Sequence, residues 1–124
     1  MSKKLMLYGA NGYTSRLIIN ELIGQNIKPI LAGRNKEKIN SLADKHGFDC
    51  SIFSLDNPDN IDDNLKNIDV IINAAGPYSL TAKSLIDSCI RTKTHYIDIT
   101  GEIDVFVYAE SKNEEATDAG IIIC

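Results

Sequence analysis

Short apolar runs alternate with stretches of helical period along this chain of 124 residues. The alternation predicts repeated strand and helix units on a parallel sheet. Residues 5–7 and 70–72 are continuously apolar, which is typical of central strands covered on both faces, whereas residues 48–52 alternate like a strand near an edge. The expected strands are 4–8, 28–32, 49–53, 68–73, 95–99 and 120–124. The predicted fold is α/β, with a doubly wound parallel sheet of about six strands in the order 3-2-1-4-5-6.

Apolar residues at helical spacing predict the helices between these strands. The expected buried positions are Leu17, Ile18 and Leu22 in the first helix, Ile39, Leu42 and Ala43 in the second, and Ala82, Leu85, Ile86, Cys89 and Ile90 in the fourth. Asn35 is expected to cap the second helix and Gly47 to end it. The third connection, residues 57–67, has only Ile61 and Leu65 to bury, so a solvated acidic loop and cap region is predicted there.

Composition excludes several classes of protein. Hydrophobic residues make up 44% of the chain and charged residues 24%, as in an ordinary globular domain. With neither a long apolar tract nor a signal-peptide pattern, a cytoplasmic protein without a membrane segment is expected. A net charge of −4 argues against nucleic-acid binding. The three cysteines are far apart, and the carboxylates of residues 56–63 are interpreted as solvated, so no metal site is expected.

Residues 5–15 read LMLYGANGYTS, an apolar run that meets two glycines three apart and then resumes as a helix. Gly9 lets the chain turn sharply off a strand, and Gly12 lets backbone amides at a helix N-terminus approach a pyrophosphate. Ser15 stands where a third glycine is usual and is small enough to replace it. This junction predicts a Rossmann-type dinucleotide site.

The end of the second predicted strand reads LAGRN, at residues 31–35. An NAD site places an acid here for the ribose hydroxyl, whereas an NADP site needs a cation for the 2′-phosphate. Arg34 supplies the cation, Asn35 can hydrogen-bond the same phosphate, and Lys38 lies one helical turn beyond. NADP is therefore favoured over NAD, the alternative being that Arg34 is a solvated residue at a helix start.

Two more motifs follow strands. NAAGPY, residues 73–78, offers small residues past which a cofactor can run, although a tight loop that serves packing alone would use similar residues. HYIDITGE, residues 95–102, places Asp98, Thr100 and Glu102 near the expected nicotinamide, and His95 at the opposite end of its strand. Asp98, Thr100 and Glu102 are hypotheses for substrate-proximal positions, whereas His95 is interpreted as a surface histidine. No catalytic residue is assigned.

Tyr108 and Lys112 match the YxxxK dyad of short-chain dehydrogenases, which also carry a glycine-containing loop after the fourth strand. That family needs a further strand, helix and strand between the two features, and the interval between Gly76 and Tyr108 is too short for them. The match is interpreted as coincidental.

Taken together, GANGYTSRL (9–17), LAGRN (31–35), NAAGPY (73–78) and YIDITGE (96–102) resemble the N-terminal NADP-binding domain of the saccharopine dehydrogenase family, including its saccharopine dehydrogenase-like oxidoreductases. The resemblance implies pyrophosphate contacts from the glycine segment, a 2′-phosphate contact from Arg34 and a nicotinamide side lined by residues 75–77. The candidate cofactor-binding residues are Gly9, Ala10, Asn11, Gly12, Tyr13, Thr14, Arg34, Asn35, Ala75, Gly76 and Pro77.

The family's second domain, which supplies most substrate contacts, has no counterpart after Cys124. Residues 1–124 are therefore predicted to be the NAD(P)-binding part of a longer oxidoreductase that transfers hydride to or from a small substrate, and to be inactive alone. One alternative is a non-enzymatic NADP(H) sensor of the NmrA type, and another is a structural domain with a degenerate site. Exposed sheet edges and uncovered apolar helix surface also favour a homodimer.

Overall fold

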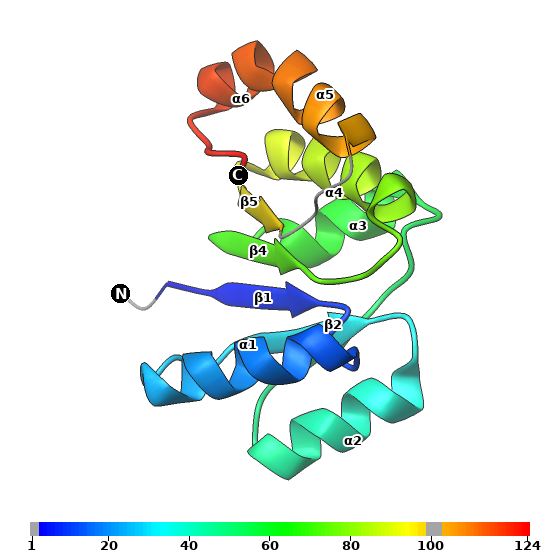
Figure 1. The fold of residues 1–124 in the computed structure, drawn as a ribbon, viewed down its shortest axis with the longest axis vertical. Helices are drawn as coiled ribbons and strands as arrows, with labels where there is room; N and C mark the ends of the chain where they lie inside the picture. The colour runs from blue at the N-terminus through cyan, green and yellow to red at the C-terminus, as the bar shows by residue number, and fades with distance from the viewer. Residues whose placement is uncertain (1–2, 99–102) are drawn as a thin grey trace.

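The computed structural model describes residues 3–98 and 103–124. Within them, five parallel strands form one sheet in the order β3-β2-β1-β4-β5 (Figure 1). The strands are β1 (Leu5–Tyr8), β2 (Ile30–Gly33), β3 (Cys50–Ile52), β4 (Val70–Asn73) and β5 (His95–Asp98). The predicted fold class and the order of these strands are confirmed, and β3 lies at an edge as its alternating pattern indicated.

Helices cover both faces of the sheet. They are α1 (Tyr13–Gly24), α2 (Lys36–His46), α3 (Pro58–Leu65), α4 (Tyr78–Thr92), α5 (Ile103–Ser111) and α6 (Asn113–Ala119). The helices α1 and α2 pack on one face and α3 and α4 on the other, while α5 and α6 pack against α4 (Figure 1). None of the helices in the described part of the chain is long and apolar enough to cross a membrane.

The central strand β1 joins the two halves of the core. Met6 and Tyr8 point into the cluster beneath α3 and α4, and Leu7 points into the cluster beneath α1 and α2. All three side chains are at least 98% buried, because the strand is covered on both faces. Cys89, on α4, is fully buried in the first of these clusters, as its position on an apolar helix face predicted.

The expected sixth strand is shorter than predicted. Residues 120–124 lie beside β5, where Ile123 forms an isolated parallel bridge with Tyr96. The Tyr96 amide donates to the Ile122 carbonyl at 2.9 Å, and the Cys124 amide donates to the Tyr96 carbonyl at 2.8 Å. Because Gly120 caps the C-terminus of α6 in a left-handed conformation, the extended run begins only after that residue. The segment is thus a single bridge in the expected position rather than a strand.

The apolar face of α1 differs from the expected one. Leu17 is 59% exposed, whereas Ile19 is buried against α2 and the sheet. Ile18 and Leu22 are partly buried. Several apolar residues in succession are compatible with more than one rotation of a helix about its axis, and packing against the sheet selects the rotation.

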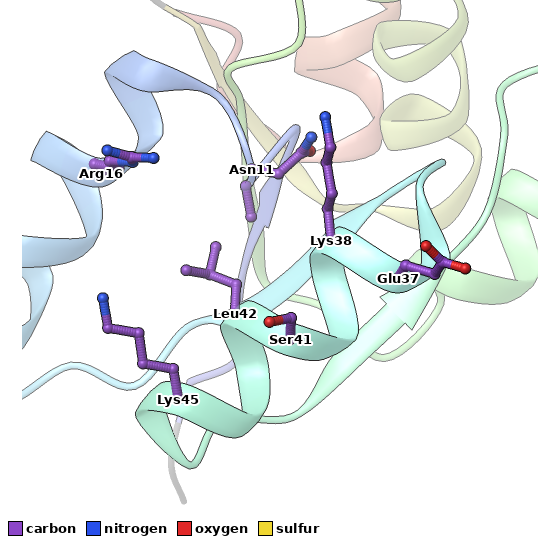
Figure 2. Close-up of a pocket in the computed structure, with 8 residues that line it drawn as sticks. Asn11, Arg16, Glu37, Lys38, Ser41, Leu42 and Lys45 are labelled. Carbon is purple, nitrogen blue, oxygen red and sulfur yellow. The ribbon is translucent and has the colours of Figure 1, made fainter.

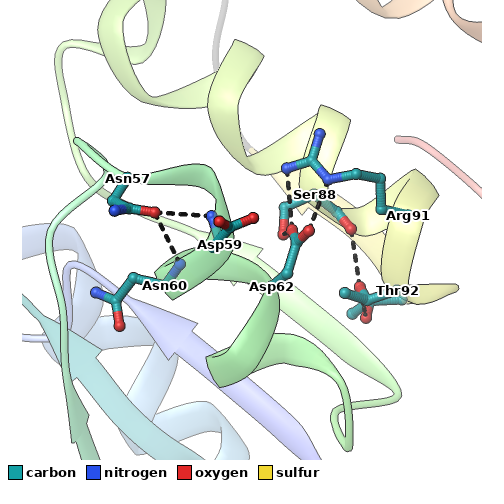
Figure 3. Close-up of polar contacts among 8 residues, drawn as sticks. Asn57, Asp59, Asn60, Asp62, Ser88, Arg91 and Thr92 are labelled. Carbon is teal, nitrogen blue, oxygen red and sulfur yellow. Dashed lines mark hydrogen bonds and ion pairs between the residues drawn. The ribbon is translucent and has the colours of Figure 1, made fainter.

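The prediction of a loop at residues 57–67 is wrong, because α3 occupies most of this segment. The Asn57 side chain accepts hydrogen bonds from the amides of Asp59 and Asn60, and Pro58 takes the first helical position (Figure 3). Ile61 and Leu65, four residues apart, are both buried. A cap, a favourable proline and two apolar positions on one face are sufficient for a short helix that packs on α4.

An ion pair joins α3 to α4. The Arg91 guanidinium donates from Nε to Asp62 Oδ2 at 2.7 Å and from Nη2 to Oδ1 at 2.9 Å, and the buried Ser88 hydroxyl also donates to Oδ1 (Figure 3). The hydrogen bond from Arg91 is the main cause that lowers the pKa of Asp62. The sequence analysis interpreted the Asp62 carboxylate as solvated. In the structure it stabilises the contact between α3 and α4.

We expect Asp62→Asn to lower the free energy of unfolding at neutral pH by about 1–2 kcal/mol, because Arg91 and Ser88 lose their anionic partner. Since the pKa of Asp62 in the folded state lies below its ordinary value of 3.8, this stabilisation is present above that value and is lost as the pH falls through the folded-state pKa. Urea denaturation at neutral and acidic pH measures both effects.

The matched control is Asp63→Asn, which removes an exposed carboxylate from the same helix and should change the free energy of unfolding by less than about 0.5 kcal/mol. A difference between wild type and Asp62→Asn that stays constant into strong acid contradicts the role of the ionised carboxylate.

Candidate functional site

The turn between β1 and α1 is clamped between two neighbouring segments. Gly9 has a φ of +81°, and a Cβ built on it would lie 2.8 Å from Ala75 in the loop after β4. The amides of Gly9 and Ala10 both donate to the Ala32 carbonyl on β2, at 2.8 and 3.1 Å. Gly9 is required here by its backbone conformation and by the close approach of Ala75.

Ser15 completes this turn. Its side chain is fully buried, and its hydroxyl donates to the Gly9 carbonyl at 2.7 Å, an oxygen that also accepts from the Gly12 amide at 3.1 Å. The serine therefore fits the place of the usual third glycine and ties the first turn of α1 to the glycine segment. The first amides of α1 have no acceptor within the helix, so they form a positive end at the rim of the sheet.

A cavity of about 560 Å³, here called the crevice, opens above the carboxyl ends of β1, β2 and β4. It is lined by Tyr8, Gly9, Asn11, Gly12, Gly33, Arg34, Asn35, Ala74, Ala75 and Gly76. Three motifs that are far apart in the sequence therefore meet at one cavity. A Cβ built on Gly76 would have no atom within 4 Å, so packing does not require glycine there and the space faces the crevice.

A second cavity of about 260 Å³ adjoins the crevice and shares Tyr8, Arg34, Ala75 and Gly76 with it. Pro77, Leu80 and Thr81 line it from the start of α4, and Leu55 and Asp56 line it from the segment after β3. The sequence analysis missed Leu55 and Asp56. The signal was available, because they follow β3 as Arg34 follows β2, at the same edge of a parallel sheet.

Tyr8 was also missed. Its hydroxyl donates to the Phe53 carbonyl at 2.9 Å, which ties the end of β1 to the segment after β3. Burial raises the pKa of Tyr8 to about 12, and the nearby Arg34 charge opposes that rise only in part. The phenol is therefore neutral at physiological pH and acts as a hydrogen-bond donor in the wall of the crevice.

A buried network connects the loop after β4 to the end of β5. Asn73 is fully buried, and its Nδ2 donates to Thr81 Oγ1 and to the Tyr96 hydroxyl, both at 3.0 Å. Asn73 Oδ1 accepts from the Ala75 amide at 3.0 Å, and Thr81 Oγ1 donates to the Ala75 carbonyl at 2.8 Å. The Tyr96 hydroxyl donates to Asp98 Oδ2 at 2.6 Å. Asp98 and Ala75 are thus held by one set of hydrogen bonds.

Burial, followed by the hydrogen bond to Asp98, raises the pKa of Tyr96. The Tyr96 phenol therefore keeps its proton and donates a hydrogen bond to the Asp98 carboxylate. Because Asn73 pairs with Asp98 in the register of β4 and β5, both lie at the carboxyl edge of the sheet. The structure therefore places Asp98 at the edge that carries the crevice.

The remaining candidates have varied positions. Tyr13 and Thr14 are exposed in the first turn of α1, and Ala10 is buried beneath the glycine segment. Asn35 Oδ1 accepts from the Lys38 amide at 3.0 Å, which confirms the predicted cap of α2. Two candidates, Thr100 and Glu102, lie outside the described residues.

His95 begins β5, away from the crevice, and its Nδ1 accepts a hydrogen bond from the Ile122 amide at 3.0 Å. Tyr108 and Lys112, the match to a catalytic dyad, have structural partners instead. The Tyr108 hydroxyl donates to Asp87 on α4, and Lys112 lies over the Tyr108 ring and 3.7 Å from Asp87. Within residues 3–98 and 103–124, no group of three or more His, Cys, Asp or Glu side chains is placed to hold a metal ion.

A family model described as the saccharopine dehydrogenase NADP binding domain matches residues 5–124. The human saccharopine dehydrogenase-like oxidoreductase is 27% identical over 139 residues, which cover 96% of this chain and 32% of that protein. The chain therefore spans about a third of the length of this curated relative.

Two solved structures share the fold. Apo saccharopine dehydrogenase (L-Glu forming) from Saccharomyces cerevisiae superposes with a TM-score of 0.83 and 24% identity, over 98% of this chain and 26% of that one. The binary complex of leucoanthocyanidin reductase with NADPH from Vitis vinifera has a TM-score of 0.70 and 14% identity, over 98% of this chain and 49% of that one.

We expect Gly9→Ala to lower the free energy of unfolding by about 2–4 kcal/mol, because it adds a side chain at positive φ and drives a methyl group into Ala75. Gly12→Ala is the matched control, since a Cβ there would meet the Gly9 carbonyl at 3.4 Å, an ordinary contact distance. Its cost should be about 1 kcal/mol or less, from the loss of a favourable N-cap residue. Equal losses in urea denaturation of the two variants would contradict the clamp at Gly9.

Proposed function

The chain belongs to the saccharopine dehydrogenase NADP-binding domain family, and on that premise we propose that its crevice binds NADP(H) for hydride transfer to or from a small substrate. One observation carries the proposal. The positive end of α1, a glycine turn held against Ala75 and the cation Arg34 all border the same cavity. A dinucleotide site needs amides that bind the pyrophosphate, a backbone that the cofactor can approach closely, and a group that recognises the adenosine ribose or its phosphate. The end of α1, the glycine turn and Arg34 match these needs in that order.

The pyrophosphate is proposed to lie at the N-terminus of α1. Gly9, Asn11 and Gly12 line the crevice at this point, and Tyr13 and Thr14 contribute amides of the first helical turn. Negative charge is stabilised there by unpaired amides and by the helix dipole. Ala10 lies beneath the segment, where its small buried side chain supports the turn.

The adenosine end is proposed to lie against β2, with Arg34 and Asn35 at the 2′-phosphate. Arg34 is exposed at the border of the crevice, so its guanidinium is available to an anion. The Asn35 Oδ1 accepts the capping hydrogen bond from Lys38, which leaves the amide nitrogen of this side chain as its donor to a phosphate.

The nicotinamide end is proposed to lie beside Ala75, Gly76 and Pro77, with Asp98 close to the substrate. The cofactor supplies the redox chemistry, and the protein binds and orients it. The network through Asn73 supports this assignment, because it holds Ala75 and, through Tyr96, the Asp98 carboxylate in one arrangement. A carboxylate fixed in this way can accept a hydrogen bond from a substrate without reorganisation.

We expect the chain to bind NADPH more tightly than NADH, and Arg34→Ala to weaken NADPH binding by about 1.5–3 kcal/mol, because a phosphate-paired arginine is lost. NADH affinity should be unchanged by the same substitution, which makes it the internal control. Isothermal titration calorimetry measures all four affinities. Equal loss of NADH and NADPH binding in the variant would contradict the assignment of Arg34 to the 2′-phosphate.

The human relative is about three times as long as this chain, and we infer that a further domain of such a protein encloses the substrate. Residues 1–124 alone are then expected to bind NADPH without steady turnover, because such a domain would be needed to exclude water and orient the substrate. Absorbance of NADPH, followed with a panel of small carbonyl and imine compounds, tests this expectation. Steady oxidation by the 124-residue chain would contradict it.

A further inference from the structure

The backbone of Ala75, in the loop after β4, is fixed by its neighbours. Its amide donates to Asn73 Oδ1 at 3.0 Å, and its carbonyl accepts from Thr81 Oγ1 at 2.8 Å. Gly9 packs on the same residue from the turn after β1. Because both polar groups of the Ala75 backbone have partners within the protein, this wall of the crevice has a fixed position.

The same network fixes the Asp98 carboxylate. Tyr96 is 1% exposed, and its hydroxyl accepts from Asn73 Nδ2 at 3.0 Å and donates to Asp98 Oδ2 at 2.6 Å. Asp98 is the register partner of Asn73, and paired strands lie about 4.8 Å apart. The carboxylate is therefore tied, through one buried phenol, to the residue that holds Ala75.

Cations gather on the other side of β1. A hollow of about 450 Å³ lies between α1 and α2, with Arg16 approaching it from α1 and Lys38 and Lys45 from α2 (Figure 2). The Glu37 carboxylate is turned away from it (Figure 2). None of these three cations takes part in an ion pair within the described ranges of the chain. This side of the sheet edge therefore carries excess positive charge.

The charges along the carboxyl edge of the sheet thus have a polarity. Arg34 adds a cation to the lining of the crevice after β2, and Asp56 lines the adjoining cavity with it. Asp98 lies at the opposite end of the edge, where β5 ends. Oxidised NADP⁺ has the same polarity, since its adenosine end carries phosphates and its nicotinamide ring a positive charge. The reduced ring is neutral.

We propose that Asp98, held by Tyr96, stabilises the positive nicotinamide ring of bound NADP⁺ and so favours the oxidised cofactor over the reduced one. Opposite charges attract, and the neutral ring of NADPH gains nothing from the carboxylate. Tyr96 and Asn73 are positioning residues, because they act on the cofactor through Asp98 and Ala75. The inference rests on the proposed function, which puts the nicotinamide beside residues 75–77, and extends it to the oxidation state of the cofactor.

The test uses the purified 124-residue chain with Asp98→Asn, which removes the charge and can still accept from Tyr96, and with Tyr96→Phe, which removes the hydrogen bond. Tyr108→Phe is the matched control. The Tyr108 hydroxyl also donates to an aspartate, Asp87, but neither residue lines the crevice or the adjoining cavity. The probes are NADP⁺, NADPH and adenosine 2′,5′-bisphosphate, which has no nicotinamide. Calorimetry measures each affinity, and urea denaturation checks that each variant is folded.

We expect Asp98→Asn to weaken NADP⁺ binding about three- to tenfold and to leave the binding of NADPH and the bisphosphate unchanged. Tyr96→Phe should change the ratio of NADP⁺ to NADPH affinity in the same direction by a smaller factor, because the carboxylate remains but is less firmly held. A purely structural role of Tyr96 would weaken both oxidation states equally. Tyr108→Phe should keep the ratio of wild type.

Three results overturn the inference in distinguishable ways. If both cofactor forms bind and Asp98→Asn keeps their affinity ratio, or Tyr96→Phe weakens both equally, the inference fails and the proposed function stands. If wild type binds the bisphosphate but neither cofactor form more tightly, the nicotinamide end of the site is wrongly assigned. If wild type binds none of the three probes, the proposed function of the isolated chain fails and the inference fails with it.

Discussion

The contact between Gly9 and Ala75 is the constraint on which the candidate site depends. A Cβ built on Gly9 would lie 2.8 Å from Ala75, so the turn after β1 packs directly against the loop after β4. The amide end of α1 and the small residues 74–76 therefore border one cavity. Two sets of hydrogen bonds also hold this turn. The Ser15 hydroxyl donates to the Gly9 carbonyl, and the amides of Gly9 and Ala10 donate to the Ala32 carbonyl. Glycine and alanine residues therefore line most of this part of the crevice.

Polar groups around that clamp divide into two kinds. Buried ones, such as Asn73, Tyr96 and Ser15, have hydrogen-bond partners within the protein and hold loops in place. Exposed ones, such as Arg34 and Lys38, have no ion-pair partner among the described residues and border cavities. A buried polar group without a partner is costly, whereas an exposed cation is solvated until an anion arrives. This division is the arrangement expected of a rigid site for a charged ligand.

Sequence reasoning succeeded where a local pattern has one physical solution. The apolar run before Gly9 predicted a central strand, and Asn35 and Gly47 predicted the ends of α2, because caps depend on near neighbours. It failed at α3, where an acidic composition concealed a short helix whose contact with α4 includes the ion pair of Asp62 with Arg91. That pair joins residues 29 apart in the chain, and no local pattern indicates it.

The sequence by itself determined the fold class, the order of five strands and the positions of the three motifs that follow them, because strand and helix periods and glycine turns are properties of short segments. Only the tertiary structure decided that Leu55, Asp56 and Arg34 line one cavity and that residues 120–124 make a single bridge. These features depend on how helices rotate and pack on the sheet. Packing is a balance among distant residues, which a linear pattern does not contain.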